Sequence, residues 1–340
     1  MPKIVRFHKT GGPEVLKLEE LPLDEPGAGE VRLKVEAIGL NNAEMLFRRG
    51  HYVAVPKFPS RLGIEAAGVV DAIGSGVSGF AVGDRVGTVP YLPTDKHGNW
   101  TAAPSKHGVY GESALYPARA VTPTPANLSV EESAAVWCPY LTAWGGLIDY
   151  CGITGDDTVL VTAASGSAGL AGVRIAKDVG ATVIATTRTA AKKQFLLDVA
   201  GADDVIVTGE EDIAERVMEI TSGQGFTAAY DPVGGPFIAA LIDAAKPCAT
   251  IVNYGNQSPD PLNFMILPML AKRLTLKTHS LFDTPRDTAA FARGTSYVRQ
   301  RLESGALKPM IDRTFALDEI VESHRYMEAQ QQTGKIVVLT

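Results

Sequence analysis

The clearest indication of the fold is the segment Thr158-Val-Leu-Val-Thr-Ala-Ala-Ser-Gly-Ser-Ala-Gly-Leu-Ala-Gly172. Its β-branched run, Val159–Thr162, predicts a buried parallel strand, which a turn of small residues joins to an apolar helix. Laid on the dinucleotide fingerprint G-x-G-x-x-G, the glycine positions are Ala164, Gly166 and Gly169. The stretch therefore predicts a diphosphate on the N–H groups of the first helical turn. Similar turns occur in methyltransferases and other α/β proteins, so the turn alone leaves those alternatives open.

The composition predicts a soluble globular protein. The chain has 340 residues, enough for about two domains, and it is 45% hydrophobic and 21% charged. A net charge of −6 without a basic run argues against a nucleic-acid partner. No apolar stretch approaches the ~20 residues of a membrane span, and Met1–Phe7 resembles a strand rather than a signal peptide. Three widely spaced cysteines indicate reduced thiols, so we expect a cytoplasmic protein.

The pattern of elements changes along the chain. Residues 1–126 contain short alternating strands separated by Gly and Pro turns, as in a β-barrel-like domain, with an irregular surface excursion expected over Pro93–His107. Ser129-Val-Glu-Glu132 predicts a capping box. From there to Tyr254 strands and helices alternate, which predicts a doubly wound parallel sheet with helices on both faces.

The residues after the second strand of this region predict NADPH as the cofactor rather than NADH. NAD-specific units carry an acidic residue there, about 20 residues beyond the glycines, to bind the ribose. This chain has Thr186-Thr-Arg-Thr189 instead, with no carboxylate. Arg188 and Lys192 can form charge-assisted hydrogen bonds with a 2′-phosphate. The alternative is that both cations are solvated at a helix start, and the KM values for the two nucleotides distinguish the two readings.

Motifs along nearly the whole chain resemble those of the medium-chain dehydrogenase/reductase superfamily, and within it the zinc-free quinone oxidoreductases. The motifs are Ala37–Glu44, Arg49–Tyr52, Gly63–Gly68, Val82–Val86, Tyr140–Ala143, Ala163–Gly169 and Tyr230–Gly235. The resemblance implies an α/β fold with a central Rossmann domain, residues 127–270, and a GroES-like β-rich catalytic domain formed by residues 1–126 and 271–340. It further implies an active site in the cleft between the domains and a homodimer or homotetramer.

The same resemblance implies no metal. Zinc members of the superfamily bind catalytic zinc through Cys, His and Cys, and these positions fall at Asn41, Ile64 and Cys138 here. Isoleucine cannot bind a metal, and one thiolate cannot replace three protein ligands. Without a Lewis acid, hydride transfer from nicotinamide C4 to an electron-poor acceptor is favoured over the reduction of a simple ketone. We therefore expect NADPH-dependent reduction of a quinone or an α,β-unsaturated carbonyl.

Motif matches imply the residues of the site. Asn41 and Tyr52 line the pocket for nicotinamide and substrate, and Tyr52 is the candidate donor to the substrate oxygen or the proton source, with water as an alternative. Glu65 matches the acid beside the zinc-binding His, and a structural role is expected for it. The expected cofactor-binding residues are Thr142, Ser165, Gly166, Ser167, Ala168, Gly169, Arg188, Lys192, Asn256 and Lys335.

Two other functions remain open from the sequence. One is an enoyl-thioester reductase of the same superfamily, and the other is an NADPH-binding protein with a structural or sensing role and little turnover. A panel of quinones, alkenals and crotonyl-thioester with NADPH distinguishes the three functions.

Overall fold

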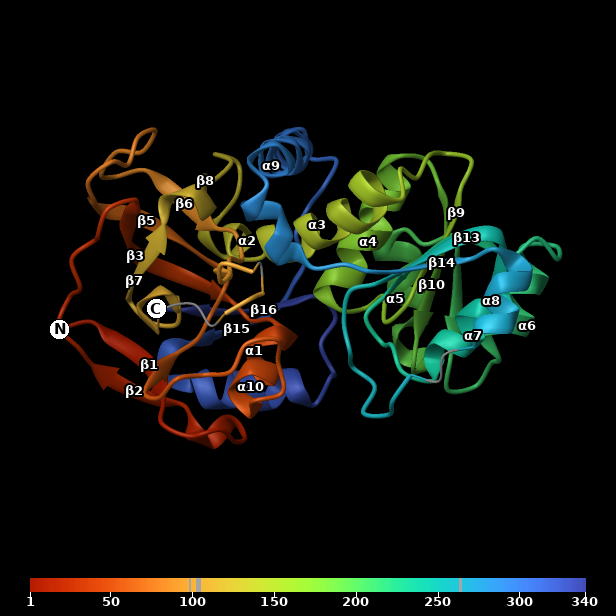
Figure 1. Ribbon diagram of the computed structural model, residues 1–340, viewed down its shortest axis with the longest axis horizontal. Helices are drawn as coiled ribbons and strands as arrows, with labels where there is room; N and C mark the ends of the chain where they lie inside the picture. Colours follow the sequence, from red (N-terminus) through yellow and green to blue (C-terminus); the bar gives the residue numbers. More distant parts are fainter. Residues whose placement is uncertain (98, 102–104, 263–264) are drawn as a thin grey trace. The chain divides into compact units, whose positions relative to one another are not determined.

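The computed structural model describes residues 1–97, 99–101, 105–262 and 265–340 (Figure 1). The chain forms two compact units. The first, here called the β-rich unit, contains Met1–Cys138, Phe282–Thr295 and Pro309–Thr340, and the second, the Rossmann unit, contains Pro139–Leu281 and Ser296–Lys308. Within the described ranges, no helix has the length and apolarity needed to cross a membrane.

The β-rich unit is built on two sheets. Its strands are β1 (Lys3–Phe7), β2 (Lys17–Glu20), β3 (Glu30–Gly39), β4 (Ser60–Arg61), β5 (Ala66–Ile73), β6 (Arg85–Thr88), β7 (Ser113–Pro117), β8 (Val121–Pro123), β15 (Ile311–Ala316) and β16 (Lys335–Leu339). The larger sheet has the order β15-β16-β3-β5-β6-β8, with β7 also paired to β3, and the smaller sheet has the order β2-β1-β4. Because β16 pairs antiparallel with β3, the last strand of the chain lies beside residues 37–39.

Among the described residues, three α-helices belong wholly to the β-rich unit: α1 (Asn42–Arg49), α2 (Val130–Ser133) and α10 (Ile320–Glu328). The expected capping box at the start of α2 is present, with Glu132 N donating to Ser129 Oγ at 3.2 Å. At the start of α1, Glu44 Oε2 accepts a hydrogen bond from the backbone N–H of Asn41 at 2.8 Å, which is the Glu44 half of a capping box. Two further helices, α3 (Trp137–Ala143) and α9 (Thr288–Glu303), each contribute residues to both units.

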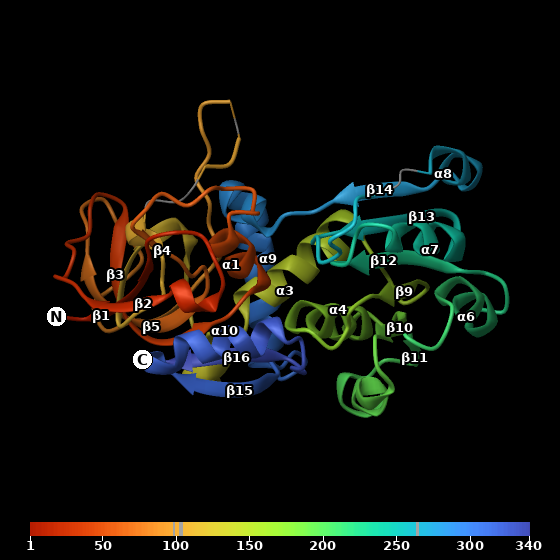
Figure 2. The same ribbon diagram turned by 90° about the horizontal axis from the view of Figure 1, so that it is seen from below.

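The Rossmann unit contains the doubly wound sheet that the sequence predicted. Its elements are β9 (Thr158–Val161), α4 (Ser167–Asp178), β10 (Thr182–Thr187), α5 (Lys193–Phe195), β11 (Asp204–Val207), α6 (Ile213–Ile220), β12 (Phe226–Asp231), α7 (Phe237–Ala244), β13 (Ala245–Asn253), α8 (Ile266–Lys272) and β14 (Thr275–Thr278). The strands are parallel in the order β11-β10-β9-β12-β13-β14, the order of a dinucleotide-binding sheet. Figures 1 and 2 show α4 on one face of the sheet and α7 on the other.

The structure differs from the sequence prediction in a few elements. Strand β14 follows residue 270, the limit expected for the Rossmann domain, and it extends the sheet beyond that limit. Where alternating strands and helices predict a single helix after β10, residues 190–200 form a 3-10 turn, α5 and a π turn. In the excursion expected over Pro93–His107, Thr94 and Trp100 form a bridge, while residues 98 and 102–104 lie outside the described residues.

Candidate functional site

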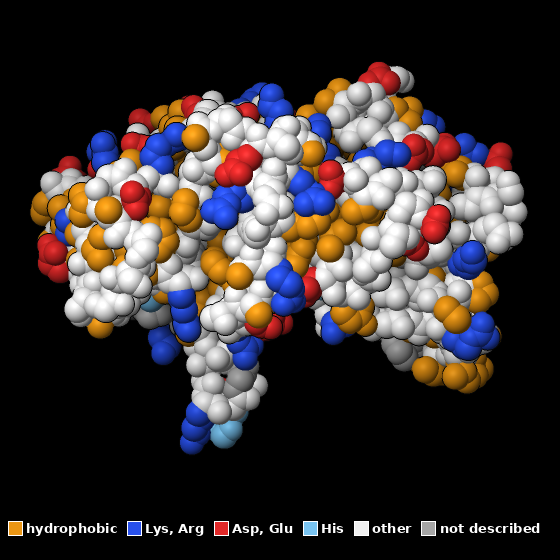
Figure 3. All heavy atoms as spheres, turned by 90° about the horizontal axis from the view of Figure 1, so that it is seen from above, with side chains coloured by type: hydrophobic (Ala, Val, Ile, Leu, Met, Phe, Trp, Pro, Cys, Tyr) orange, Lys and Arg blue, Asp and Glu red, His pale blue; other side chains and the backbone are white. Residues whose placement is uncertain are grey.

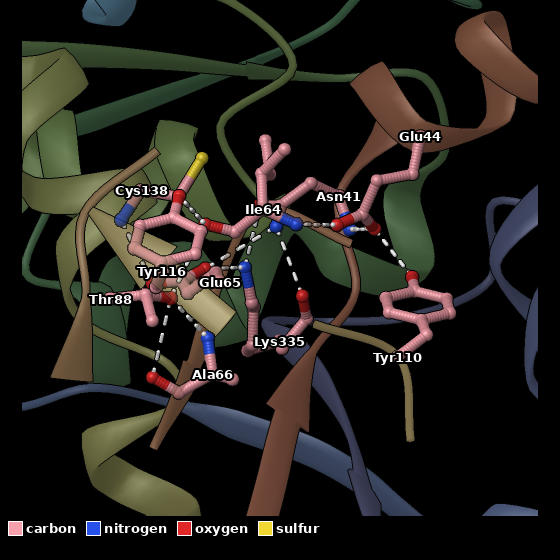
Figure 4. Close-up of polar contacts among 11 residues, drawn as sticks. Asn41, Glu44, Ile64, Glu65, Ala66, Thr88, Tyr110, Tyr116, Cys138 and Lys335 are labelled. Atoms are coloured by element: carbon pink, nitrogen blue, oxygen red, sulfur yellow. Dashed lines mark hydrogen bonds and ion pairs between the residues drawn. The ribbon is translucent and has the colours of Figure 1, made fainter. Parts of the chain in front are cut away.

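A cluster of buried polar side chains lies in the β-rich unit, where the end of β3 meets the start of β16 (Figure 4). We call it the Asn41 cluster, and its members are Asn41, Glu44, Glu65, Tyr110 and Lys335. Each of the five side chains is more than nine-tenths buried. Buried polar groups of this kind need partners, because removing them from water is costly. Here the members of the cluster and nearby backbone groups supply those partners.

A buried ion pair forms the centre of the cluster. Lys335 is 1% exposed and Glu65 is 0% exposed. The Lys335 ammonium pairs with Glu65 Oε2 and donates to Asn41 Oδ1 at 2.7 Å. Glu65 Oε1 also accepts a hydrogen bond from the backbone N–H of Cys138 at 2.8 Å. The ammonium of Lys335 therefore has its partners within its own unit, and its expected contact with the cofactor stays a prediction.

Glu44 is a member of the cluster that the sequence reasoning missed. Its carboxylate accepts hydrogen bonds from the backbone N–H groups of Asn41 and Ile64, at 2.8 and 2.9 Å, and from the Tyr110 hydroxyl. Burial raises the pKa of Glu44 to about 7, against the opposing effects of these donors and of Lys335. The signal was present in the sequence, because Asn41-x-x-Glu44 has the spacing of a capping box, in which the Glu44 carboxylate accepts from the backbone N–H of Asn41.

The Glu44→Gln variant is expected to lose part of the pH dependence of stability. The folded-state pKa of Glu44, about 7, lies above the ordinary value of 4.5 for a glutamate. The contribution of Glu44 to the free energy of unfolding is therefore complete below pH 4.5, its ordinary pKa. It is lost, by up to about 3 kcal/mol, as the pH rises through the folded-state pKa of about 7. Urea unfolding of both proteins between about pH 5 and pH 8 measures this. The advantage of the wild type over the variant should shrink with rising pH, and a constant difference would contradict the prediction.

Tyr52 lies in the loop that follows α1 and is half-buried. Burial raises the pKa of Tyr52, so its hydroxyl stays protonated at neutral pH and keeps a proton to donate. Its ring meets Phe282 edge to face, with 6.2 Å between centroids, and Phe282 meets Trp100 in the same way at 6.1 Å. Three segments far apart in the sequence thus contribute aromatic rings to one group. The role of Tyr52 as a donor remains a prediction.

The positions that resemble zinc ligands lie around the same cluster. Asn41 is a member, the backbone N–H of Ile64 donates to Glu44, and that of Cys138 donates to Glu65. Among the residues that the structure describes, no group of three or more His, Cys, Asp and Glu side chains could hold a metal ion.

In the Rossmann unit, the turn after β9 leads into the amino end of α4. Ala163 adopts a left-handed φ of 46°, and Gly166 is the extended N-cap residue. A Cβ on Gly169 would lie 2.7 Å from both Ala163 O and Ala164 Cα, so only glycine allows the helix to pack this close to the turn. The first N–H groups of α4, on Ser167, Ala168 and Gly169, have no partner inside the helix and are suited to an anion.

Other expected cofactor-binding residues lie at the same edge of the Rossmann sheet. Because β9, β10 and β13 are parallel, the residues that follow them meet at one edge. These residues are Ser165 after β9, the exposed Arg188 directly after β10, Lys192 in the next 3-10 turn, and the exposed Asn256 beyond β13. Thr142 lies apart from them in the sequence, in α3, and is 8% exposed.

Asp231, which ends β12, organises this edge and had no role in the sequence prediction. It is fully buried and accepts hydrogen bonds from the Thr162 hydroxyl, from Asn253 Nδ2 at 3.0 Å and from the backbone N–H of Gly234 at 2.8 Å. One carboxylate therefore ties the ends of β9 and β13 to the loop after β12. The motif Tyr230–Gly235 contained this signal, because a buried strand that ends in Asp needs donors for the carboxylate.

Known proteins resemble the chain over its whole length. Residues 27–126 match the family "Alcohol dehydrogenase GroES-like domain", and residues 200–338 match the family "Zinc-binding dehydrogenase". Quinone oxidoreductase of Pseudomonas aeruginosa is 33% identical, with 100% of both chains covered. The 2-haloacrylate reductase of a Burkholderia species is 31% identical, with 98% of this chain and 97% of the relative covered.

A solved structure extends this similarity to three dimensions. Quinone oxidoreductase of Escherichia coli, solved in complex with NADPH, is 30% identical and superposes with a TM-score of 0.89, covering 99% of this chain and 100% of that chain. These matches confirm the resemblance and the Rossmann and GroES-like fold expected from the sequence. The chain belongs to the quinone oxidoreductases of the medium-chain dehydrogenase/reductase superfamily.

Proposed function

We propose that the protein reduces quinones or other electron-poor conjugated carbonyls with NADPH and without a metal ion. The observation that carries this proposal lies at one edge of the Rossmann sheet, where α4 follows β9 and a basic residue, Arg188, follows the paired parallel strand β10 in place of an acidic one. An acidic residue at the end of β10 would repel a 2′-phosphate, whereas a guanidinium attracts it. The Escherichia coli relative solved with NADPH supports the same cofactor.

The residues at this edge fit the proposed cofactor. The N–H groups at the amino end of α4 would hold the diphosphate, and Gly169 keeps the turn close to the helix. Arg188 and Lys192 would hold the 2′-phosphate, while Asn256 and Thr142 are proposed for the nicotinamide side. Bound NADPH supplies a hydride from nicotinamide C4. Binding and orientation are thus the contribution of these side chains.

The acceptor needs a hydrogen-bond donor for the oxygen on which negative charge develops. Tyr52 suits this role because its hydroxyl stays protonated and its ring belongs to the aromatic group with Phe282 and Trp100. A flat conjugated acceptor packs favourably against such rings. Conjugation also delocalises the developing charge, so the reaction depends less on a Lewis acid. The 2-haloacrylate reductase relative supports this acceptor class.

The Tyr52→Phe variant is expected to lose about fivefold to tenfold in kcat/KM for a quinone, the cost of about one hydrogen bond. The ring and its contact with Phe282 are retained, so the variant removes the donor and little else. Steady-state rates at saturating NADPH measure the effect. A loss below about threefold would reduce Tyr52 to a residue that positions the substrate, with water as the proton source.

The experiment that tests the proposal follows NADPH absorbance with a panel of small quinones, alkenals and crotonyl-thioester. Turnover of quinones or alkenals is the expected result. Turnover of the thioester alone would favour an enoyl-thioester reductase. Tight NADPH binding without turnover on any electrophile would favour a structural or sensing role instead.

We also propose that the protein is a homo-oligomer, either a homodimer or a homotetramer. In α8, the side chains of Ile266, Leu267 and Leu270 are each more than half exposed, and the neighbouring strand β14 is at the edge of its sheet. Figure 3 shows hydrophobic side chains gathered at the lower right of the molecule. A second copy would cover these groups. Sedimentation of the wild type and of the Leu267→Lys variant tests this, and a monomeric wild type would refute it.

A cytoplasmic location is proposed as well, since the three cysteines, all in the described part, form no disulfide.

A further inference from the structure

We propose that Lys335 is a positioning residue that fixes the side-chain amide of Asn41 so that Asn41 acts in the reaction only as a hydrogen-bond acceptor. The inference rests on the proposed function for its catalytic consequence, while the orientation itself is a property of the cluster. On this inference, the hydrogen bond to the substrate oxygen is donated by groups other than Asn41, and Tyr52 is one of them.

The orientation of the Asn41 amide follows from the chemistry of its neighbours. An ammonium can only donate a hydrogen bond, and an ionised carboxylate can only accept one. Asn41 Oδ1 lies 2.7 Å from Lys335 Nζ, while Nδ2 lies 3.0 Å from Gly39 O and 3.4 Å from Glu65 Oε2. If the amide turned by half a rotation, an NH2 group would face the ammonium and an oxygen would face two acceptors. Only one of the two orientations is therefore satisfied.

After these contacts, the side-chain amide of Asn41 can form one more hydrogen bond, and it can form it only as an acceptor. Asn41 Nδ2 has two hydrogens, and Gly39 O and Glu65 Oε2 accept both. Oδ1 has two lone pairs and uses one for Lys335. Asn41 can thus accept a hydrogen bond from an O–H or N–H group of a bound molecule, and it has no hydrogen left for a carbonyl oxygen.

The backbone around the cluster holds Lys335 in place. A Cβ on Gly39 would lie 2.0 Å from Ala134 O and 2.7 Å from Lys335 Cε, so the ammonium end of Lys335 passes through space that only glycine leaves open. Glu65 is anchored in turn by the N–H of Cys138 at 2.8 Å. Both ends of the ion pair are therefore fixed by the fold, and the amide between them has little freedom to rotate.

Hydrogen exchange of the Asn41 side-chain amide tests the orientation without turnover. The protein is labelled with 15N-asparagine, and the Asn41 signals are identified by their loss in Asn41→Leu. We expect slow exchange in the wild type and exchange at least about tenfold faster in Lys335→Met, because the amide is then free to rotate. Lys106→Met is the control: it removes a lysine of the same unit that pairs with Glu30 at 2.8 Å, and it should leave the Asn41 signals unchanged. Equal exchange in Lys335→Met and the wild type would overturn the inference.

A double-mutant cycle tests the catalytic consequence. Lys335→Met is expected to lower kcat/KM for a quinone by about tenfold in the wild-type background and by less than about twofold in Asn41→Leu. Equal losses in both backgrounds would mean that Lys335 acts without Asn41, as a direct cofactor contact would. If Lys335→Met does not fold, the variant Glu65→Gln/Lys335→Met removes the unpaired charge and replaces it in both experiments. Failure of the wild type to reduce any acceptor would refute the proposed function, whereas the exchange experiment would still decide the inference.

Discussion

Replacing Glu65 by Leu is expected to lower the free energy of unfolding by about 3–5 kcal/mol, a very large effect for one substitution. Glu65 is fully buried, and its loss leaves the Lys335 ammonium without its counter-ion in the interior. The backbone N–H of Cys138 and the amide of Asn41 also lose an acceptor. Urea unfolding followed by fluorescence measures the change, with the slope against denaturant checked for a change in the denatured state.

Two controls separate the ion pair from a general defect at this position. The double variant Glu65→Leu/Lys335→Met should recover at least about half of the loss, because an apolar pair can replace a buried ion pair at little cost. Glu322→Gln breaks an exposed pair with Arg325 in α10 and should change stability by less than about 0.5 kcal/mol. A double variant no more stable than Glu65→Leu would contradict the assignment of the loss to the unpaired ammonium.

Local patterns were sufficient to predict the Rossmann unit. The strand and turn before α4, the strand Thr182–Thr187 and the capping box at Ser129 each depend on neighbours within a few residues. Their periodicity and turn residues are therefore visible in the sequence. The position of the candidate site residues after these strands could be predicted with them, because parallel strands present their carboxyl ends at one edge, while the roles of these residues remain predictions.

The Asn41 cluster could not be predicted from local patterns. Glu65 and Lys335 are separated by 270 positions, and only the pairing of β16 with β3 brings Lys335 beside Gly39 and Asn41. The register of a strand pair so distant in sequence is fixed by the packing of the whole sheet. Strand β15 has a weak local signal for a related reason: it lies beside β16 at the edge of the sheet, and its partly exposed residues lack a clear alternation.

Removing Arg188 and Lys192 together is expected to abolish the preference for NADPH. A charge-assisted hydrogen bond contributes about 1.5–3 kcal/mol, which corresponds to about tenfold to hundredfold in binding. The loss of both the guanidinium and the ammonium should therefore raise the KM for NADPH by no less than this range. NADH has no 2′-phosphate, so its KM should change by less than about twofold. Steady-state kinetics of Arg188→Ala/Lys192→Ala with both nucleotides and one quinone measure this.

The adjacent lysine provides the matched control for that double variant. Lys193 begins α5 directly after Lys192, and Lys193→Ala removes the same charge one position further along the chain. If the 2′-phosphate is bound by Arg188 and Lys192 in particular, Lys193→Ala should leave the ratio of the two KM values unchanged. If instead the phosphate is attracted only by the general positive charge after β10, all single substitutions should lower the preference to a similar, small extent, and added salt should reduce it further. Unchanged NADPH kinetics in Arg188→Ala/Lys192→Ala would remove this edge of the sheet as the source of NADPH preference.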